Sequence, residues 1–97
     1  MTGRGAGTHL SRSAAIVNRR GLHARAAAKF VTLAERFSAV VTVRKDGQEV
    51  PAQSIMGLMM LGAGQGSTIE MHAEGWDAKE ALDALTALVA RGFDESD

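Results

Sequence analysis

The sequence predicts a single α+β domain in which helices cover one face of a four-stranded antiparallel sheet. Four segments with strand-like composition and three with helix-like patterns follow one another in the order β-α-β-β-α-β-α. The stretch Lys45-Asp46-Gly47-Gln48 carries the Asp-Gly signal of a hairpin between two adjacent antiparallel strands. Apolar residues that alternate along a strand need a helical layer to cover them, and this favours a two-layer arrangement.

The four strands are expected at residues 11–17, 39–44, 48–50 and 67–74. Pro51 ends the third strand or marks an edge of the sheet, because proline cannot donate to a hydrogen-bond ladder. In the fourth strand Ile69, Met71 and Ala73 alternate with polar residues, which is typical of a half-buried strand. The histidine among those polar residues, His72, is therefore expected to be solvated and not catalytic.

The three helices are expected at residues 24–36, 55–61 and 78–91. The first has apolar residues at helical spacing: Ala27, Phe30, Val31 and Ala34. The second begins after Ser54, a good N-cap residue, and ends at Gly62.

The last helix has the clearest local signals. Asp77 and Glu80 have the spacing of a capping box, and Trp76 before them is expected to pack against Ala81. Gly92 is expected to end the helix. Its buried stripe is expected to contain Ala78, Ala81, Leu82, Leu85, Leu88 and Val89.

Length and composition suit one small globular domain and exclude several functions. Eleven basic and eleven acidic residues in a chain of 97 give a formal net charge of 0, with 4% aromatic residues. This argues against a nucleic-acid or anionic membrane partner. The absence of cysteine excludes disulfides, and the three histidines lack metal-ligand spacing, so we expect no metal and no cofactor. No apolar run approaches the ~18 residues of a membrane span, and we expect a cytoplasmic protein.

The two ends of the chain are expected to lie outside the folded domain. Residues 1–10 contain three glycines and little to bury, so they are expected to form a flexible tail in which His9 is incidental. The domain itself is expected at 11–92. Residues 93–97 are then an acidic tail, which is expected to be frayed from Asp94 onward, while Phe93 could fold back.

The strongest candidate site is His23, which stands directly before the first predicted helix. The first N–H groups of a helix have no intrahelical partner, and the helix dipole adds positive charge there. The backbone at Ala24 and Arg25 is therefore suited to a phosphate. The same charge disfavours a protonated imidazole, and a neutral histidine can act as a nucleophile. Arg25 adds a guanidinium group that matches phosphate geometry.

Two readings of this stretch remain open at the level of local pattern. A histidine near a helix start is more often a cap or a surface residue than a nucleophile. The adjoining Arg19 and Arg20 are more often solvated than functional, although they could also steer an acidic partner to the site.

The second helix is unusually apolar for six or seven residues. All of its apolar residues could face the core. Part of the set could instead form an exposed docking patch, a use to which methionine is well suited. Residues 55–61 contain Ile55, Met56, Leu58, Met59, Met60 and Leu61.

Together these stretches resemble a known family. Gly21-Leu22-His23-Ala24-Arg25 followed by Ala27-Ala28-Lys29-Phe30-Val31 resembles the active-site signature of HPr, the histidine-containing phosphocarrier of the bacterial phosphoenolpyruvate-dependent phosphotransferase system. The block from Ser54 to Ala63 resembles the family's regulatory serine segment. The resemblance covers about residues 11–92. Many family members have proline where this chain has Ala26, and alanine preserves the helix.

The resemblance implies an open-faced sandwich, a monomer, and a carrier that does not turn over substrate alone. Phosphorylated enzyme I would donate to Nδ1 of His23, and an EIIA-type protein would accept. Arg25 would stabilise the phosphate, and HPr kinase/phosphorylase would modify Ser54 as a regulatory site. The residues implied in partner docking are Arg20, Ile55, Met56 and Met59.

Two alternatives to a phosphate carrier for sugar uptake remain open. A small α+β domain can be a non-catalytic module that binds metabolites or proteins, since fold does not determine function. Within the family, a regulatory nitrogen-type relay is the other possibility, and Ser54 with Ala26 gives it slight support.

Overall fold

The computed structural model describes residues 9–95 and has the predicted class and element order. One antiparallel sheet, with strand order β1-β4-β2-β3, contains β1 (His9–Ala15), β2 (Val40–Lys45), β3 (Gln48–Pro51) and β4 (Thr68–Glu74). The three helices are α1 (Ala24–Ala34), α2 (Ile55–Met60) and α3 (Ala78–Ala90). A short 3-10 helix, Gly92–Asp94, follows α3.

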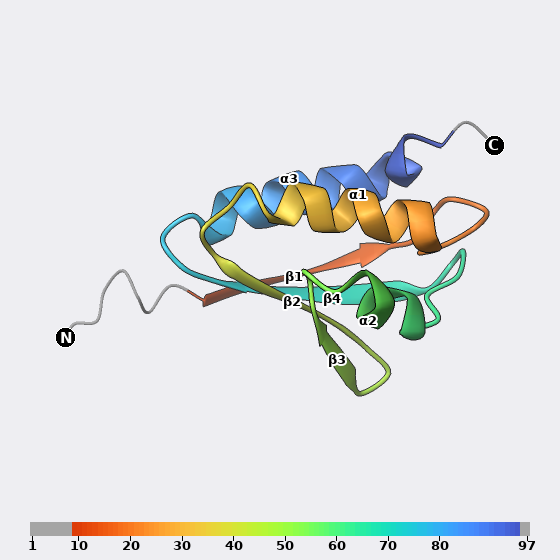
Figure 1. Cartoon of the computed structure of the whole chain (residues 1–97), viewed down its shortest axis with the longest axis horizontal. Coiled ribbons are helices and arrows are strands. Elements are labelled where there is room, and N and C mark those ends of the chain that lie inside the picture. Colours follow the sequence, from red (N-terminus) through yellow and green to blue (C-terminus); the bar gives the residue numbers. More distant parts are fainter. Residues whose placement is uncertain (1–8, 96–97) are drawn as a thin grey trace.

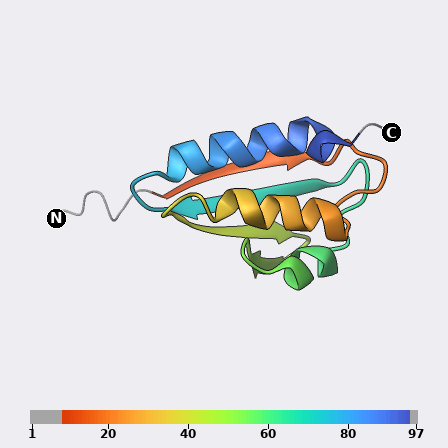
Figure 2. The same ribbon diagram turned by 45° about the horizontal axis from the view of Figure 1, so that its top comes forward.

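The helices form one layer and the sheet forms the other. Helices α1 and α3 run side by side over one face of the sheet, and α2 packs against α1 and β3 (Figures 1 and 2). The opposite face of the sheet is open, as in the expected open-faced sandwich. Among residues 9–95, no helix is long and apolar enough to cross a membrane.

The core lies between these two layers. The apolar stripes predicted for α1 and α3 are all buried, which confirms both helical patterns. Residues Ile69, Met71 and Ala73 of β4 are buried beneath them, also as predicted. The largest fully buried side chains are Phe30, Phe93, Ile16, Leu58, Ile69, Met71, Leu82, Leu85, Val43 and Val89.

The predicted hairpin joins β2 to β3. Asp46 and Gly47 have φ values of 51° and 82°, so both central residues are left-handed, as a type I′ turn requires. Pro51 lies in β3, the edge strand, where a missing N–H leaves no neighbour unpaired.

The folded domain extends beyond the predicted boundaries at both ends. His9 and Leu10, expected in the tail, belong to β1 and pair with Glu74 and Ala73. The His9 ring stacks on His72 on the open face, with ring centroids 5.4 Å apart. The rest of the predicted N-terminal tail, residues 1–8, lies outside the described residues. Phe93, expected in the acidic tail, is fully buried.

The capping box predicted for α3 is wrong. Asp77 makes no side-chain capping bond. Its carboxylate instead accepts hydrogen bonds from the N–H groups of Ser38 and Ala39, each at 2.8 Å, and Asp77 is only 5% exposed. The turn between α1 and β2 leaves these two N–H groups without strand partners, and a buried donor requires an acceptor. Trp76 is 75% exposed, so it does not cover the core as the predicted contact with Ala81 would require.

We predict that Asp77→Ala destabilises the fold by about 2 kcal/mol, because it leaves the buried N–H of Ala39 and the partly buried N–H of Ser38 without an acceptor. Glu80→Ala, at the other position of the supposed capping box, should change stability by less than about 0.5 kcal/mol. Urea denaturation of both variants measures the difference. Equal losses would show that Asp77 and Glu80 act together as a cap after all.

Candidate functional site

The loop before α1 is held against the segment that precedes β4. The N–H of Leu22 donates to the carbonyl oxygen of Ala63 at 2.9 Å. Gly21 has a φ of 68°, and a Cβ atom there would lie 2.5 Å from the same carbonyl oxygen. Only glycine fits this conformation and this close approach. The contact therefore determines where the next residue, His23, enters α1.

His23 is the N-cap residue of α1, as predicted. Its backbone is extended, with φ −81° and ψ −176°, and its carbonyl accepts the first helical hydrogen bond from Ala27 at 2.8 Å. Its side chain makes no capping bond. The N–H groups at Ala24 and Arg25 thus have the position of open helix N-terminal donors, where an anion is favoured.

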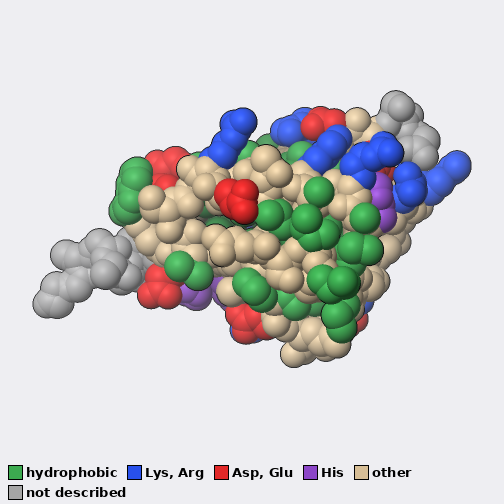
Figure 3. Space-filling view, in the orientation of Figure 1, with side chains coloured by type: hydrophobic (Ala, Val, Ile, Leu, Met, Phe, Trp, Pro, Cys, Tyr) green, Lys and Arg blue, Asp and Glu red, His purple; other side chains and the backbone are tan. Residues whose placement is uncertain are grey.

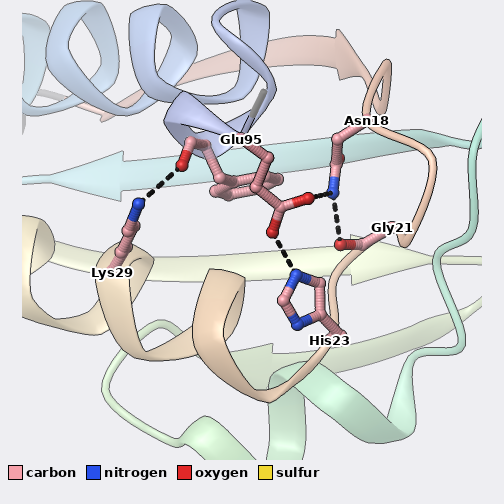
Figure 4. A network of polar contacts seen from close by, with 6 residues as sticks. Asn18, Gly21, His23, Lys29 and Glu95 are labelled. Carbon is pink, nitrogen blue, oxygen red and sulfur yellow. Dashed lines mark hydrogen bonds and ion pairs between the residues drawn. The ribbon is translucent and has the colours of Figure 1, made fainter. Parts of the chain in front are cut away.

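The imidazole of His23 contacts a carboxylate from the other end of the chain. Nε2 of His23 faces Oε2 of Glu95, 72 residues away (Figure 4). The second carboxylate oxygen of Glu95 accepts a hydrogen bond from Nδ2 of Asn18 at 3.0 Å. The same amide nitrogen donates to the carbonyl oxygen of Gly21 at 2.8 Å. Asn18 therefore links the loop before α1 to Glu95 in the C-terminal segment.

The surroundings of Glu95 favour its charged form. Hydrogen bonds from His23 and then from Asn18 lower the pKa of Glu95 below its ordinary value of 4.5, while burial opposes this shift. The positive charge of Arg20 acts in the same direction as the hydrogen bonds. Arg20, a predicted docking residue, is exposed near this carboxylate.

A tight left-handed turn brings Glu95 to the site, and we call residues 92–95 the C-terminal hook. Gly92, Phe93 and Asp94 have φ values of 65°, 57° and 62°. The ring of Phe93 is fully buried, and its carbonyl accepts a hydrogen bond from Nζ of Lys29 at 2.8 Å. The sequence patterns placed residues 93–95 of the hook in an acidic tail outside the domain. The available signal was a phenylalanine directly after the glycine that ends α3, since a large apolar residue tends to be buried.

Arg25 is exposed at the start of α1. The polar partner of the His23 ring is Glu95, whereas Arg25 lines a groove of about 380 Å³ between α1 and α3. This groove adds positive charge beside the helix start, since four of its lining residues are basic. The charged residues that line it are Arg25, Lys29, Arg36, Arg91 and Asp94.

Helix α2 presents an exposed apolar patch, which confirms the second of the two alternatives that its sequence left open. Leu58 is its buried residue. The α2 patch consists of Ile55, Met56, Met59 and Met60, of which Met56 and Met60 are 68% and 72% exposed. In Figure 3, hydrophobic side chains over α2 lie at the same end of the molecule as a histidine and several basic side chains.

Ser54 is the N-cap of α2, as predicted. Its hydroxyl oxygen accepts a hydrogen bond from the N–H of Gly57 at 2.8 Å. The residue is half-buried and adjoins the α2 patch.

Comparison with known proteins identifies the family. Residues 10–91 match the family described as the PTS HPr component phosphorylation site. The chain belongs to the HPr family. It is therefore a phosphocarrier protein of the phosphotransferase system (PTS) and not an enzyme that turns over a substrate.

Relatives of two named kinds resemble this HPr-family chain. Phosphocarrier protein HPr of Cupriavidus necator is 49% identical over 88 residues, which cover 91% of this chain and 99% of the relative. Phosphocarrier protein NPr of Shewanella violacea is 46% identical, with 92% and 98% covered. The crystal structure of HPr-C-His from Thermoanaerobacter tengcongensis superposes with a TM-score of 0.85 at 45% identity, over 90% of this chain and 98% of that one.

We predict that the contact between His23 and Glu95 is lost in acid. The pKa of Glu95 is lower in the folded protein than in the unfolded chain. The contact therefore stabilises the fold fully above pH about 4.5, and this stabilisation disappears as the pH falls through the folded pKa. A carboxyl ¹³C NMR titration of Glu95 measures the midpoint. A midpoint at or above 4.5 would contradict the hydrogen bonds assigned to this carboxylate.

Proposed function

We propose that His23 accepts a phosphoryl group from phosphorylated enzyme I and passes it to a histidine of an EIIA-type protein, as a cytoplasmic, monomeric carrier. The observation that supports this most strongly is the N-cap position of His23. There the residue directly precedes the open amides of Ala24 and Arg25. A non-catalytic binding module would have no need of a histidine in this position.

The arrangement suits temporary storage of a phosphoryl group. Phosphoryl transfer depends mainly on positioning and charge stabilisation. The helix N-terminus and the guanidinium group of Arg25 stabilise the added charge without enclosing it, since Arg25 is exposed. Each partner then supplies the other half of the site, and the carrier can release the group as readily as it receives it.

Docking is proposed to use Arg20 together with Ile55, Met56 and Met59 of the α2 patch. Exposed apolar patches beside polar groups are typical of protein interaction sites. Methionine side chains adapt to different surfaces, which suits a carrier that binds a donor and an acceptor in turn. The basic residues around α1 would favour acidic partner surfaces.

The transfer of the phosphoryl group at His23 is proposed to be the same whether the phosphotransferase system serves sugar uptake or nitrogen-type regulation. The HPr and NPr relatives are 49% and 46% identical to this chain. We therefore propose the same chemistry at His23 for sugar uptake and for a nitrogen-type relay, with the acceptor protein determining which pathway is served.

We predict that incubation with phosphoenolpyruvate and enzyme I adds one acid-labile phosphate to the chain. His23→Ala should abolish the addition, because it removes the nucleophile. His72→Ala is the matched control, since that histidine lies on the open face of the sheet, and it should be phosphorylated like the parent. Arg25→Ala should still be phosphorylated, but more slowly. Mass spectrometry before and after mild acid measures all four proteins.

An unmodified parent chain, tested beside an HPr that enzyme I does phosphorylate, would contradict the proposed donor. Phosphate that remains on His23→Ala would contradict the proposed nucleophile. Transfer by Arg25→Ala at the parent rate would remove the role assigned to that guanidinium group.

Ser54 is proposed as a regulatory site for HPr kinase/phosphorylase. A phosphate on its hydroxyl adds a charge of about −1.5 to −2 at the start of α2. The neighbouring Ile55 and Met56 belong to the proposed docking patch, where the added charge would have to lose water on binding. Phosphorylation is therefore proposed to weaken docking of enzyme I while leaving His23 in place.

We predict that Ser54→Asp lowers the rate of phosphorylation of His23 by enzyme I. Ser54→Ala is the matched control, because it removes the cap acceptor for Gly57 without adding charge. Initial rates at several carrier concentrations should show a raised KM for the aspartate variant alone. If Ser54→Asp transfers like the parent, or if both variants are impaired equally, charge at this position is not the regulatory signal.

A further inference from the structure

We propose that Glu95 is a positioning residue for phosphoryl transfer, which holds His23 as its Nε2–H tautomer and so leaves the Nδ1 lone pair as the nucleophile. The role rests on the proposed function of His23. It gives a function to the C-terminal hook, most of which the sequence patterns place outside the domain. It also gives a physical reason why one ring nitrogen reacts and the other does not.

The tautomer follows from the chemistry of the contact. An ionised carboxylate can only accept hydrogen bonds, so the ring nitrogen that faces it must donate. Nε2 faces Oε2 of Glu95 and therefore carries the hydrogen. A neutral imidazole then has its free lone pair on Nδ1. Figure 4 shows this second ring nitrogen on the side of the ring away from Glu95.

Asn18 holds the carboxylate of Glu95, which in turn holds the imidazole ring of His23. Its Nδ2 donates both to Oε1 of Glu95 and to the carbonyl oxygen of Gly21, at 3.0 and 2.8 Å. Both partners are acceptors, so the amide nitrogen must point toward them. Asn18 is 4% exposed, and its position in the loop before α1 leaves it little freedom. The chain of contacts thus runs from the loop through Asn18 and Glu95 to Nε2 of His23.

The C-terminal hook supports the assignment independently. Three successive residues, Gly92 to Asp94, have left-handed backbone angles, and two of them are not glycine. Such a conformation is unfavourable and persists only where the surroundings impose it. Burial of Phe93 and the hydrogen bond from Lys29 hold it here. The result of this turn is that Glu95 is directed to the functional histidine.

The same contact would act while the phosphoryl group moves. The Nδ1 lone pair forms the new N–P bond as the N–P bond of the donor's phosphohistidine breaks and its electron pair returns to the donor ring. The phosphorylated His23 ring then carries a positive charge that is spread over both ring nitrogens. Nε2 keeps its hydrogen, so no proton has to leave. Glu95 offsets this charge, as the buried aspartate of a serine-protease triad does for its imidazolium. When the acceptor attacks, the electron pair of the N–P bond returns to Nδ1 and the starting tautomer is restored.

The test compares Glu95→Gln with Asp94→Asn in the full chain. Glutamine is similar in shape but can present an NH₂ donor to Nε2, so it no longer dictates the tautomer. Asp94 is the adjacent hook carboxylate and pairs with Arg91 instead of His23. Imidazole ¹⁵N chemical shifts above pH 8, assigned with His23→Ala, report which nitrogen carries the hydrogen. Rapid-quench kinetics report the rate of transfer from phosphorylated enzyme I.

We expect His23 of the parent and of Asp94→Asn to be mainly the Nε2–H tautomer, with equal transfer rates. Glu95→Gln should show a mixture of tautomers and transfer about 10-fold to 100-fold more slowly, by analogy with the loss found when the partner that orients a metal-binding imidazole is removed. An unchanged tautomer in Glu95→Gln would overturn the proposal. A changed tautomer with an unchanged rate would overturn the role of Glu95 in transfer. Failure of the proposed function would look different, because the parent itself would not be phosphorylated.

Discussion

The close contact between Gly21-Leu22 and Ala63 is the constraint on which the end of the molecule that carries His23 depends. One hydrogen bond of 2.9 Å and the absence of a Cβ atom let the loop before α1 lie directly on the segment before β4. Helix α1 therefore starts beside α2, so His23 and the α2 patch share one end of the domain. A larger residue at position 21 would have to displace backbone, not a flexible side chain.

Charge at this end is balanced locally although the chain as a whole is neutral. The start of α1, the exposed Arg20 and Arg25, and the groove beside α3 are all positive. Glu95 is a negative group placed among them and held by His23 and Asn18. A phosphoryl group at His23 would enter a positive environment in which one carboxylate faces the opposite ring nitrogen. This combination suits a group that must be bound and then released.

The sequence predicted those features that depend on near neighbours. The stripe of α3, the alternation in β4 and the Asp-Gly turn are periodic or short-range patterns, and each was confirmed. Asp77 shows where such reasoning fails. Its spacing from Glu80 fits a capping box, but two unpaired N–H groups at Ser38 and Ala39 compete for the same carboxylate. Local spacing gives no information about that competition, because the competing groups lie 38 and 39 residues away.

The sequence by itself determined the fold class, the position of His23 at a helix start, the cap at Ser54 and the membership in a family of phosphocarriers. Only the tertiary structure decided that the α2 patch is exposed, that Arg25 lines the groove beside α3, and that Glu95 contacts His23. Helix starts and caps depend on hydrogen bonds between residues a few positions apart. Contacts between residues 23 and 95 exist only after α3 has packed on the sheet and Phe93 has been buried, because those events set the direction in which the chain ends.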